Sequence, residues 1–202
     1  MAGKDFAKKT IKDVADYNSA LGKYSKITKK GYTPHYFPNT GVEFEHLMIR
    51  LFEMSGLNVC YSLINKKRVL CQYCNRTKEQ IVEQIDGVVY LDSIPFIIES
   101  KFHEEEDIKN NIEPVAKLYS RLQIRPSFAM GMIITNTGFT DPAVEYMKYL
   151  QPKNILLWQG TEIPDSINAC INGKSDFKKL LQWKMNNLIE NGINDRHVKG
   201  LL

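Results

Sequence analysis

The order of the predicted elements indicates an α/β fold with about five strands. Apolar residues repeat at helical spacing in several segments, and runs rich in Val, Ile and Tyr lie between them. In chain order these segments read helix, three strands, helix, strand, helix, strand. A chain of 202 residues, 43% hydrophobic and 25% charged, is long enough for one good core, so we expect one domain with terminal additions.

The clearest helix begins after Thr40. Its apolar residues recur at i, i+3, i+4, i+7 and i+8, and they are Phe44, Leu47, Met48, Leu51 and Phe52. Thr40 can cap this helix and Gly56 can end it. Upstream, residues 4–22 have helical composition, and residues 31–41 form an irregular connector marked by two prolines and two glycines.

Three strands are expected next, over 57–64, 81–91 and 94–101, because these segments are rich in Val, Ile and Tyr. Asp92 and Ser93 form a natural turn between the last two. A polar loop containing KKR and CQYCNRTK is expected between the first two. The later elements are a helix at 112–124, a strand at 128–135, a helix at 141–150 capped by Thr140, a strand at 154–158 and a helix at 176–191 followed by Gly192.

Positive charge is concentrated at the start of the chain. Residues 1–40 hold eight lysines against three aspartates, within a formal net charge of +4. Lysines interleaved with aromatic residues suit a phosphate backbone and its bases, so Lys23, Lys26, Lys29 and Lys30 are candidate nucleic-acid contacts. A solvated helix leading into a loop explains the same pattern, and this alternative stays open.

Hydropathy and cysteine usage predict a soluble cytoplasmic protein. No apolar run approaches the roughly 18 residues of a membrane span, and the first residues resemble no signal peptide. Four cysteines are too few for a disulfide framework, so reduced thiols are expected. Cys71 and Cys74 form half of a zinc site, and whether they bind zinc with Cys60 stays open.

Chemistry gathers on the predicted hairpin. If residues 92 and 93 form a two-residue turn, paired residues sum to 185, and Asp86 lies opposite Glu99. Two such carboxylates can share a divalent ion, which hydrolysis of a phosphodiester requires. Lys101 projects from the same face as Glu99, where it can orient or deprotonate a water, and Ser100 adds a backbone carbonyl. Alternatively, these charges occupy the solvent face of a one-sided sheet.

Three blocks resemble the Mrr-like restriction endonucleases of the PD-(D/E)XK nuclease superfamily. They are GVEFEHLMIRLFEMSG at 41–56, EQIDGVVYLDSIPFIIESK at 83–101 and GMIITNTGFTDPAVEYM at 131–147, in the order and spacing of that family. The resemblance implies a restriction-endonuclease-like core, in which helices flank a mixed central β-sheet. It also implies Mg²⁺ or Mn²⁺ at the edge where the motif strands meet.

The resemblance assigns roles residue by residue. It implies that Asp86, Glu99 and the carbonyl of Ser100 bind the metal and that Lys101 is catalytic. Glu45 matches an acidic helix residue of the family that helps bind the ion or its water, although an exposed helix residue is the alternative. Gln84, expected to face Lys101 across the hairpin, has a supporting role. HEEED after Lys101 departs from the basic or polar stretch usual in the family, which leaves open how DNA approaches that side.

The sequence therefore predicts three regions: a basic N-terminal helix and connector at 1–40, a nuclease core at 41–160 and a C-terminal helical extension at 161–202. The expected function is a metal-dependent endodeoxyribonuclease in restriction or anti-phage defence. The expected partners are DNA, a second copy of the chain, and a separate specificity or translocase subunit. Two alternatives remain: a non-catalytic nucleic-acid-binding or assembly module, and a nuclease acting on RNA or on branched or modified DNA.

Overall fold

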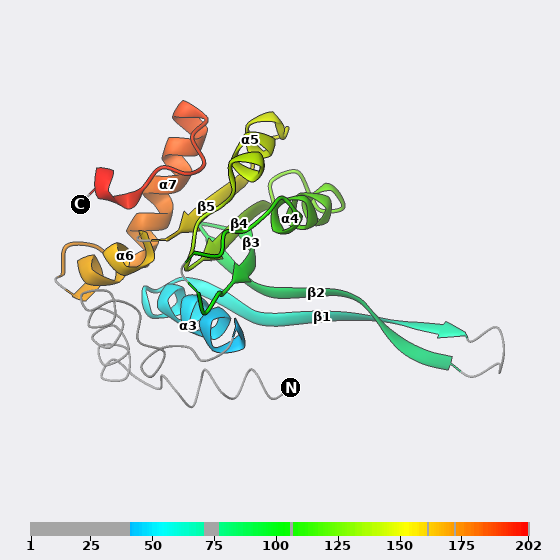
Figure 1. Cartoon of the computed structure of the whole chain (residues 1–202). Helices are drawn as coiled ribbons and strands as arrows, with labels where there is room; N and C mark the ends of the chain where they lie inside the picture. The colour runs from blue at the N-terminus through cyan, green and yellow to red at the C-terminus, as the bar shows by residue number, and fades with distance from the viewer. Residues whose placement is uncertain (1–40, 71–76, 106, 161, 172, 202) are drawn as a thin grey trace.

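The computed structural model describes residues 41–70, 77–105, 107–160, 162–171 and 173–201 (Figure 1). The helix expected at 4–22, most of the connector and the Thr40 cap lie outside these ranges. The same holds for the four lysines at positions 23, 26, 29 and 30.

Five strands form one sheet in the order β1-β2-β3-β4-β5. The strands β1, β2 and β3 pair antiparallel, whereas β3, β4 and β5 pair parallel. A short turn joins β2 to β3, while helices join the parallel strands, as such crossovers require. The predicted mixed five-stranded sheet is thus confirmed. Its strands are β1 (Asn58–Leu70), β2 (Thr77–Leu91), β3 (Ile94–Lys101), β4 (Met130–Thr135) and β5 (Ile155–Gln159).

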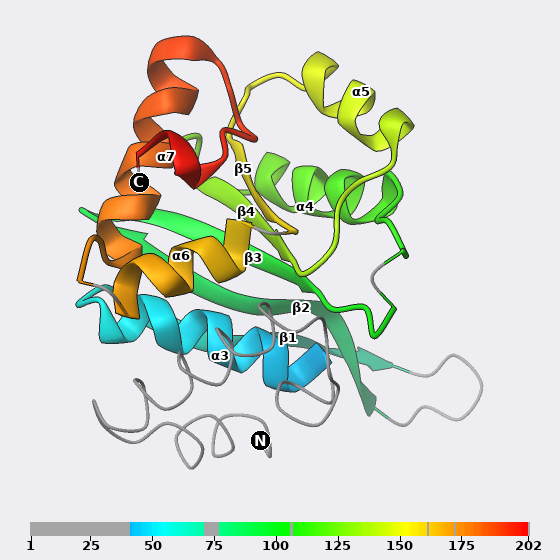
Figure 2. The same ribbon diagram turned by 60° about the vertical axis from the view of Figure 1, so that its left-hand side comes forward.

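Helices cover both faces of the sheet (Figure 2). The helices α3 (Gly41–Met54), α6 (Glu162–Ile171) and α7 (Phe177–Asn191) share one apolar cluster with β-strand side chains. The helices α4 (Glu113–Gln123) and α5 (Asp141–Tyr149) share a second cluster on the opposite face. Because both faces are covered, β4 is almost wholly buried, which explains its continuous apolar run.

The C-terminal elements pack on the core through a buried ion pair. Lys184 of α7 bonds Glu162 of α6, lies 5.4 Å from the ring centre of Trp158, and donates to the carbonyl of Arg196 at 2.8 Å. A short 3₁₀ helix, Val198–Gly200, follows α7. The region boundary expected at residue 160 stays a prediction. No described helix is long and apolar enough to cross a membrane.

One local prediction is wrong, and another is confirmed only in part. The polar loop expected after residue 64 is largely strand, because β1 runs to Leu70 and β2 starts at Thr77. These strands project from the core as a two-stranded ribbon (Figure 1), and a ribbon in water needs no apolar alternation. Thr140 occupies the N-cap position of α5, as predicted, and its carbonyl accepts from the amides of Ala143 and Val144, but its side chain makes no capping bond.

A substitution at Gly87 of β2 can test how closely α3 packs on the sheet. A Cβ at this position would lie 2.5 Å from Cδ1 of Ile49 and 3.0 Å from the carbonyl oxygen of Cys60. We expect Gly87→Ala to lower the free energy of unfolding by roughly 1–3 kcal/mol, because helix and strand must separate. Gly138→Ala, where a Cβ meets nothing within 4 Å, should change it far less. Urea denaturation measures both, and equal effects would contradict the packing described.

Candidate active site

A tight turn sets the register of β2 against β3. Asp92 and Ser93 both have positive φ, 47° and 75°, the conformation of a two-residue hairpin turn. The strands pair from Leu91 with Ile94 to Gly87 with Ile98, so paired residues sum to 185 as predicted. The register is confirmed, and the next positions along the two strands are Asp86 and Glu99.

Asp86 lies where β2 leaves β3. Its Oδ2 accepts from the Ser100 amide at 2.7 Å and from the Ser100 hydroxyl at 3.0 Å. Burial raises the pKa of Asp86 and the charge of Glu99 raises it further, whereas the Ser100 hydrogen bonds oppose the rise. Asp86 is thus bonded to the residue that follows Glu99, and the two carboxylates influence each other.

Glu99 is fully buried and bonded to three cations. Its Oε1 accepts from Lys101 at 2.8 Å and from Lys117 at 2.9 Å, while Oε2 accepts from Arg121 at 2.5 Å. Burial acts to raise the pKa of Glu99, but the hydrogen bonds from Lys101 and Lys117 outweigh it and hold that pKa below its ordinary value. The carboxylate is therefore ionised at neutral pH. The Lys101 contact also shows that the two residues of the E-x-K pair are within bonding reach.

Lys117 and Arg121 were missed by the sequence reasoning. Both belong to α4, and the next cation at the same spacing, Arg125, bonds Glu83 of β2 at 2.7 Å. Cations at every fourth position lie along one face of a helix, so this pattern could have indicated a basic face turned toward the motif strands. Arg121 also donates to the Gln84 carbonyl, which ties α4 to β2 as well as to β3.

Glu45 of α3 lies within the electrostatic reach of the motif residues. Burial raises its pKa to about 8, with further contributions from the charges of Asp86 and Glu99 and an opposing one from Lys101. Only 9% of Glu45 is exposed, so the alternative of an exposed helix residue is wrong. The fold therefore gathers the four predicted charged residues from one helix and two strands.

The carboxylate oxygens of this cluster are suitable ligands for a hard divalent cation, although the described side chains are not arranged as a metal site. Carboxylate oxygens are the ligands that Mg²⁺ prefers, and the raised pKa values of Glu45 and Asp86 reflect charges that a cation would neutralise. Within the described ranges, no three His, Cys, Asp or Glu side chains form a metal-binding group. Glu99 in particular is bonded to Lys101, Lys117 and Arg121, and a metal ion would compete with these three cations for its carboxylate oxygens.

The remaining candidates are less central. The side chain of Gln84, expected to face Lys101, is on an exposed residue, and its backbone carbonyl makes the contact with Arg121. Cys60 is a free thiol, whereas Cys71 and Cys74 lie outside the described residues, so the zinc question stays open. The supporting role of Gln84 and the metal role of the Ser100 carbonyl stay predictions.

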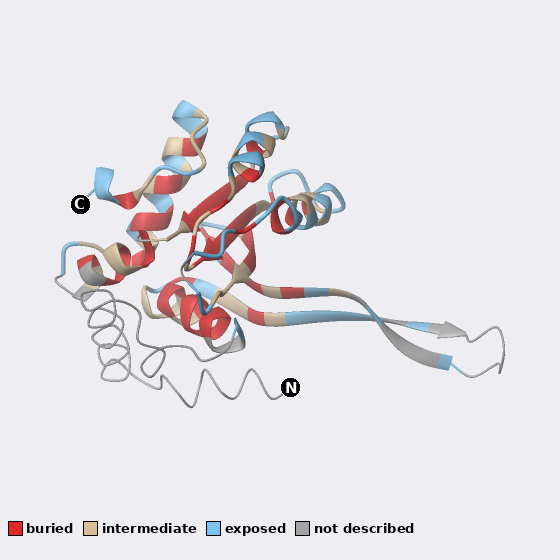
Figure 3. Cartoon of the chain, in the orientation of Figure 1, coloured by how far each residue is buried: buried red, intermediate tan, exposed pale blue. Residues whose placement is uncertain are grey.

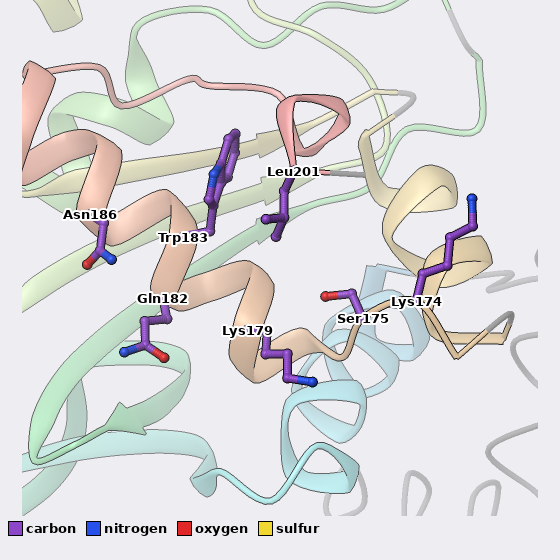
Figure 4. Close-up of a pocket in the computed structure, with 7 residues that line it drawn as sticks. All are labelled: Lys174, Ser175, Lys179, Gln182, Trp183, Asn186 and Leu201. Atoms are coloured by element: carbon purple, nitrogen blue, oxygen red, sulfur yellow. The ribbon is translucent and has the colours of Figure 1, made fainter.

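Two surface hollows differ in whether a motif residue lines them. One, of about 530 Å³, lies along α7 and contains no acidic residue among the seven that line it (Figure 4). Another, of about 340 Å³, adjoins the motif residues because Lys101 is part of its wall. Two more lysines, Lys109 and Lys117, also line it. Only the second hollow, of these two, connects with the carboxylate cluster.

Comparison with known families agrees with this geometry. A family model described as restriction endonuclease, the Mrr catalytic domain, matches residues 39–167. The match contains Glu45, Asp86, Glu99 and Lys101, and it covers well over half of the chain. The chain belongs to this family. It is accordingly a nuclease of the restriction type within the PD-(D/E)XK superfamily. No curated protein matches it.

Solved structures resemble this Mrr-family chain only distantly. The protein of unknown function AF1548 shares 23% identity at a TM-score of 0.46, over 74% of this chain and 77% of its own. The DNA modification-dependent restriction endonuclease AspBHI shares 13% identity at a TM-score of 0.38, over 82% of this chain and 41% of its own. The MspJI restriction endonuclease in complex with a 27-mer oligonucleotide shares 16% identity at a TM-score of 0.40, over 92% of this chain and 38% of its own. At such TM-scores, none of these likenesses bears on function.

Glu45 makes the stability of the metal-free protein depend on pH. Between its ordinary value of 4.5 and about 8, the unfolded chain has lost this proton while the folded chain retains it. As the pH rises through that window, the free energy of unfolding of the wild type should therefore fall relative to that of Glu45→Gln. The fall should be at most about 1.4 kcal/mol per pH unit and should level off above the window. Urea denaturation in EDTA at several pH values measures this. A wild-type free energy of unfolding that rises relative to that of Glu45→Gln as the pH increases through this window would contradict it.

Arg121 should stabilise the fold by neutralising Glu99. In Arg121→Met, the buried carboxylate retains two lysines but loses the guanidinium, and we expect a loss of about 1–3 kcal/mol in the free energy of unfolding at pH 7. Arg196→Met is the matched control, because Arg196 is exposed. Equal stability of the two variants in urea would show that Glu99 does not depend on this cation.

Proposed function

We propose that this chain is a metal-dependent endodeoxyribonuclease that hydrolyses phosphodiester bonds in DNA for restriction or anti-phage defence. The observation that carries the proposal is the convergence of Asp86, Glu99, Lys101 and Glu45 where β2 parts from β3. Two buried carboxylates, Glu45 and Glu99, close to a half-buried one, Asp86, are costly for stability, and such local conflicts mark functional sites.

Asp86, Glu99 and the Ser100 carbonyl are the proposed metal ligands, with Glu45 binding the ion or its water. A divalent ion there would neutralise charge on the phosphate and lower the pKa of a nearby water. Glu99 suits this role because its surrounding cations keep it ionised at neutral pH. The Ser100 amide and hydroxyl orient Asp86, so its second oxygen can point toward the ligand.

Lys101 is the proposed catalytic amine. It is bonded to Glu99 at 2.8 Å and is about one-third exposed, so it contacts the carboxylate and reaches the surface at once. From this position it can orient an attacking water or hold a non-bridging phosphate oxygen. Lys117, bonded to the same carboxylate oxygen at 2.9 Å, offers a second cation when Lys101 turns toward substrate.

The hollow beside Lys101 offers a path for the DNA backbone past the acidic run HEEED. Three lysines, Lys101, Lys109 and Lys117, line the hollow with one acidic residue, Glu113, and neither Glu104 nor Glu105 is part of its wall. A phosphate in the hollow would therefore meet more lysines than carboxylates, although the acidic run follows Lys101 in the sequence. This arrangement supports approach from the α4 side.

The likeness of the chain to the Mrr family supports DNA as substrate. The family model that matches residues 39–167 is described as a restriction endonuclease. Cleavage of both strands of a duplex by one site per chain favours a homodimer. The proposal also includes a separate specificity or translocase subunit. It further includes DNA recognition by four basic residues, Lys23, Lys26, Lys29 and Lys30.

Cleavage of plasmid DNA tests the proposed chemistry. With Mg²⁺ or Mn²⁺, the wild type should cut and EDTA should stop it. Asp86→Asn should lose activity on the order of a thousandfold, since several kcal/mol of transition-state stabilisation depend on the ion. The control Asp195→Asn removes an exposed carboxylate and should retain activity.

Two results would overturn the proposal. Equal activity of Asp86→Asn and Asp195→Asn would show that Asp86 is not at the active site. DNA binding without cleavage by the wild type, under any divalent ion, would instead indicate a non-catalytic binding module.

A further inference from the structure

The ribbon formed by β1 and β2 begins at the candidate active site. β2 pairs with β3 over Gly87–Leu91, while its residues from Thr77 to Ile85 pair with β1 alone among the described strands. Asp86 lies at the point of separation, where its carboxylate bonds Ser100 of β3. The base of the ribbon is therefore next to the position that the proposed function gives to a DNA phosphate.

The ribbon contributes little to the hydrophobic core. Neither core cluster contains a described residue between 62 and 84. Figure 3 shows an exposed stretch along the β1 strand of the ribbon. The residues exposed there include Ile64, Asn65, Lys66 and Arg68. Two long strands without a core to cover them are costly to keep ordered in water. A function outside the core explains their length.

Basic residues are concentrated on the ribbon strands. Residues 65–70 and 77–83 contain four cations, Lys66, Lys67, Arg68 and Lys78, against Glu79 and Glu83. Glu83 is already bonded at 2.7 Å to Arg125, which lies just after α4, so a cation outside the ribbon offsets its charge. The chain beyond residue 40 as a whole, ribbon included, is slightly acidic, with 19 basic and 20 acidic residues. The charge of the ribbon is thus opposite to that of a phosphate backbone.

We propose that the β1–β2 ribbon is a DNA-binding arm that contacts duplex DNA on one side of the cleavage position, with cations of the ribbon, Lys66 and Arg68 among them, against phosphates. The proposal rests on the proposed function, which puts a DNA phosphate at Asp86. The major groove, about 12 Å wide, admits a two-stranded β-ribbon. Six extended residues span roughly 20 Å, which corresponds to about six base pairs.

A charge-neutralising variant tests the arm directly. Lys66→Ala/Lys67→Ala/Arg68→Ala removes three cations from the ribbon. The matched control, Lys174→Ala/Lys179→Ala/Lys199→Ala, removes three exposed lysines near α6 and α7, two of which are drawn in Figure 4. Both variants change the net charge equally, so long-range electrostatics are held constant and only the location of the charge differs.

The measurement is binding of a 30-base-pair duplex in EDTA, without cleavage, over a range of salt concentrations. The ribbon variant should bind about tenfold more weakly or worse. Its plot of log affinity against log salt should be shallower by about 3, because each phosphate contact releases roughly 0.9 counterion. The control should retain the wild-type slope. Equal slopes for the two variants would overturn the proposal.

A shortened ribbon provides a second, independent variant. Asn65 and Glu83 are cross-strand partners, joined also by a side-chain hydrogen bond of 3.2 Å, so residues 66–82 can be replaced by an Asn-Gly turn. The core clusters and the Glu83–Arg125 pair remain, so this variant should fold and melt as the wild type does. Its footprint on DNA should shrink by about six base pairs on one side of the cut. An unchanged footprint would contradict the arm.

These experiments separate the arm from the nuclease activity. Ribbon-dependent binding without cleavage by the wild type would refute the nuclease and leave the arm standing. Cleavage by the wild type together with DNA binding that does not depend on the ribbon would refute the arm and leave the nuclease standing. If either ribbon variant changed the mass of the particle in sedimentation but not its affinity for DNA, the ribbon would be a contact between copies of the chain, and the proposal would be wrong.

Discussion

The antiparallel register between β2 and β3 holds the acidic residues in place, because shifting it by one residue would turn each strand's side chains to the opposite face. The register depends on a two-residue turn, in which Asp92 and Ser93 both adopt positive φ. It also depends on apolar side chains such as Val89 and Phe96, which are fully buried beneath α3. Packing far from the carboxylates therefore determines where they lie.

Electrostatics divide the carboxylates into two kinds. Glu99 is surrounded by Lys101, Lys117 and Arg121, which favour its ionised form. Asp86 and Glu45 are raised in pKa by burial and by neighbouring negative charge. The same cluster thus contains one stable anion and two groups that gain from added positive charge. That asymmetry suits a site in which a cation and a phosphate must both be accommodated.

The surroundings of the cluster suggest how a long polyanion would lie. The α4 face supplies Lys117 and Arg121 on one side, and the hollow beside Lys101 adds Lys109. The proposed arm extends from the other strand of the motif, beyond Asp86. Basic groups therefore flank the cluster in two directions, which compensates for the slightly acidic balance of the chain after residue 40.

The mixed sheet was expected from the resemblance to a known family. Periodicity and turn chemistry were sufficient to predict the helices α3, α4, α5 and α7 and the register that brings Asp86 toward Glu99. These features depend on local repetition, which one sequence displays. The polar segment after residue 64 was misread as a loop, because strands in a solvated ribbon show no apolar alternation. The roles of Lys117, Arg121 and the buried Lys184–Glu162 pair depended on contacts across the fold, between residues 18 to 22 positions apart. The sequence by itself determined which residues could perform the chemistry, whereas only tertiary packing decided which cations would neutralise them, because distance and burial set the strength of a charge interaction.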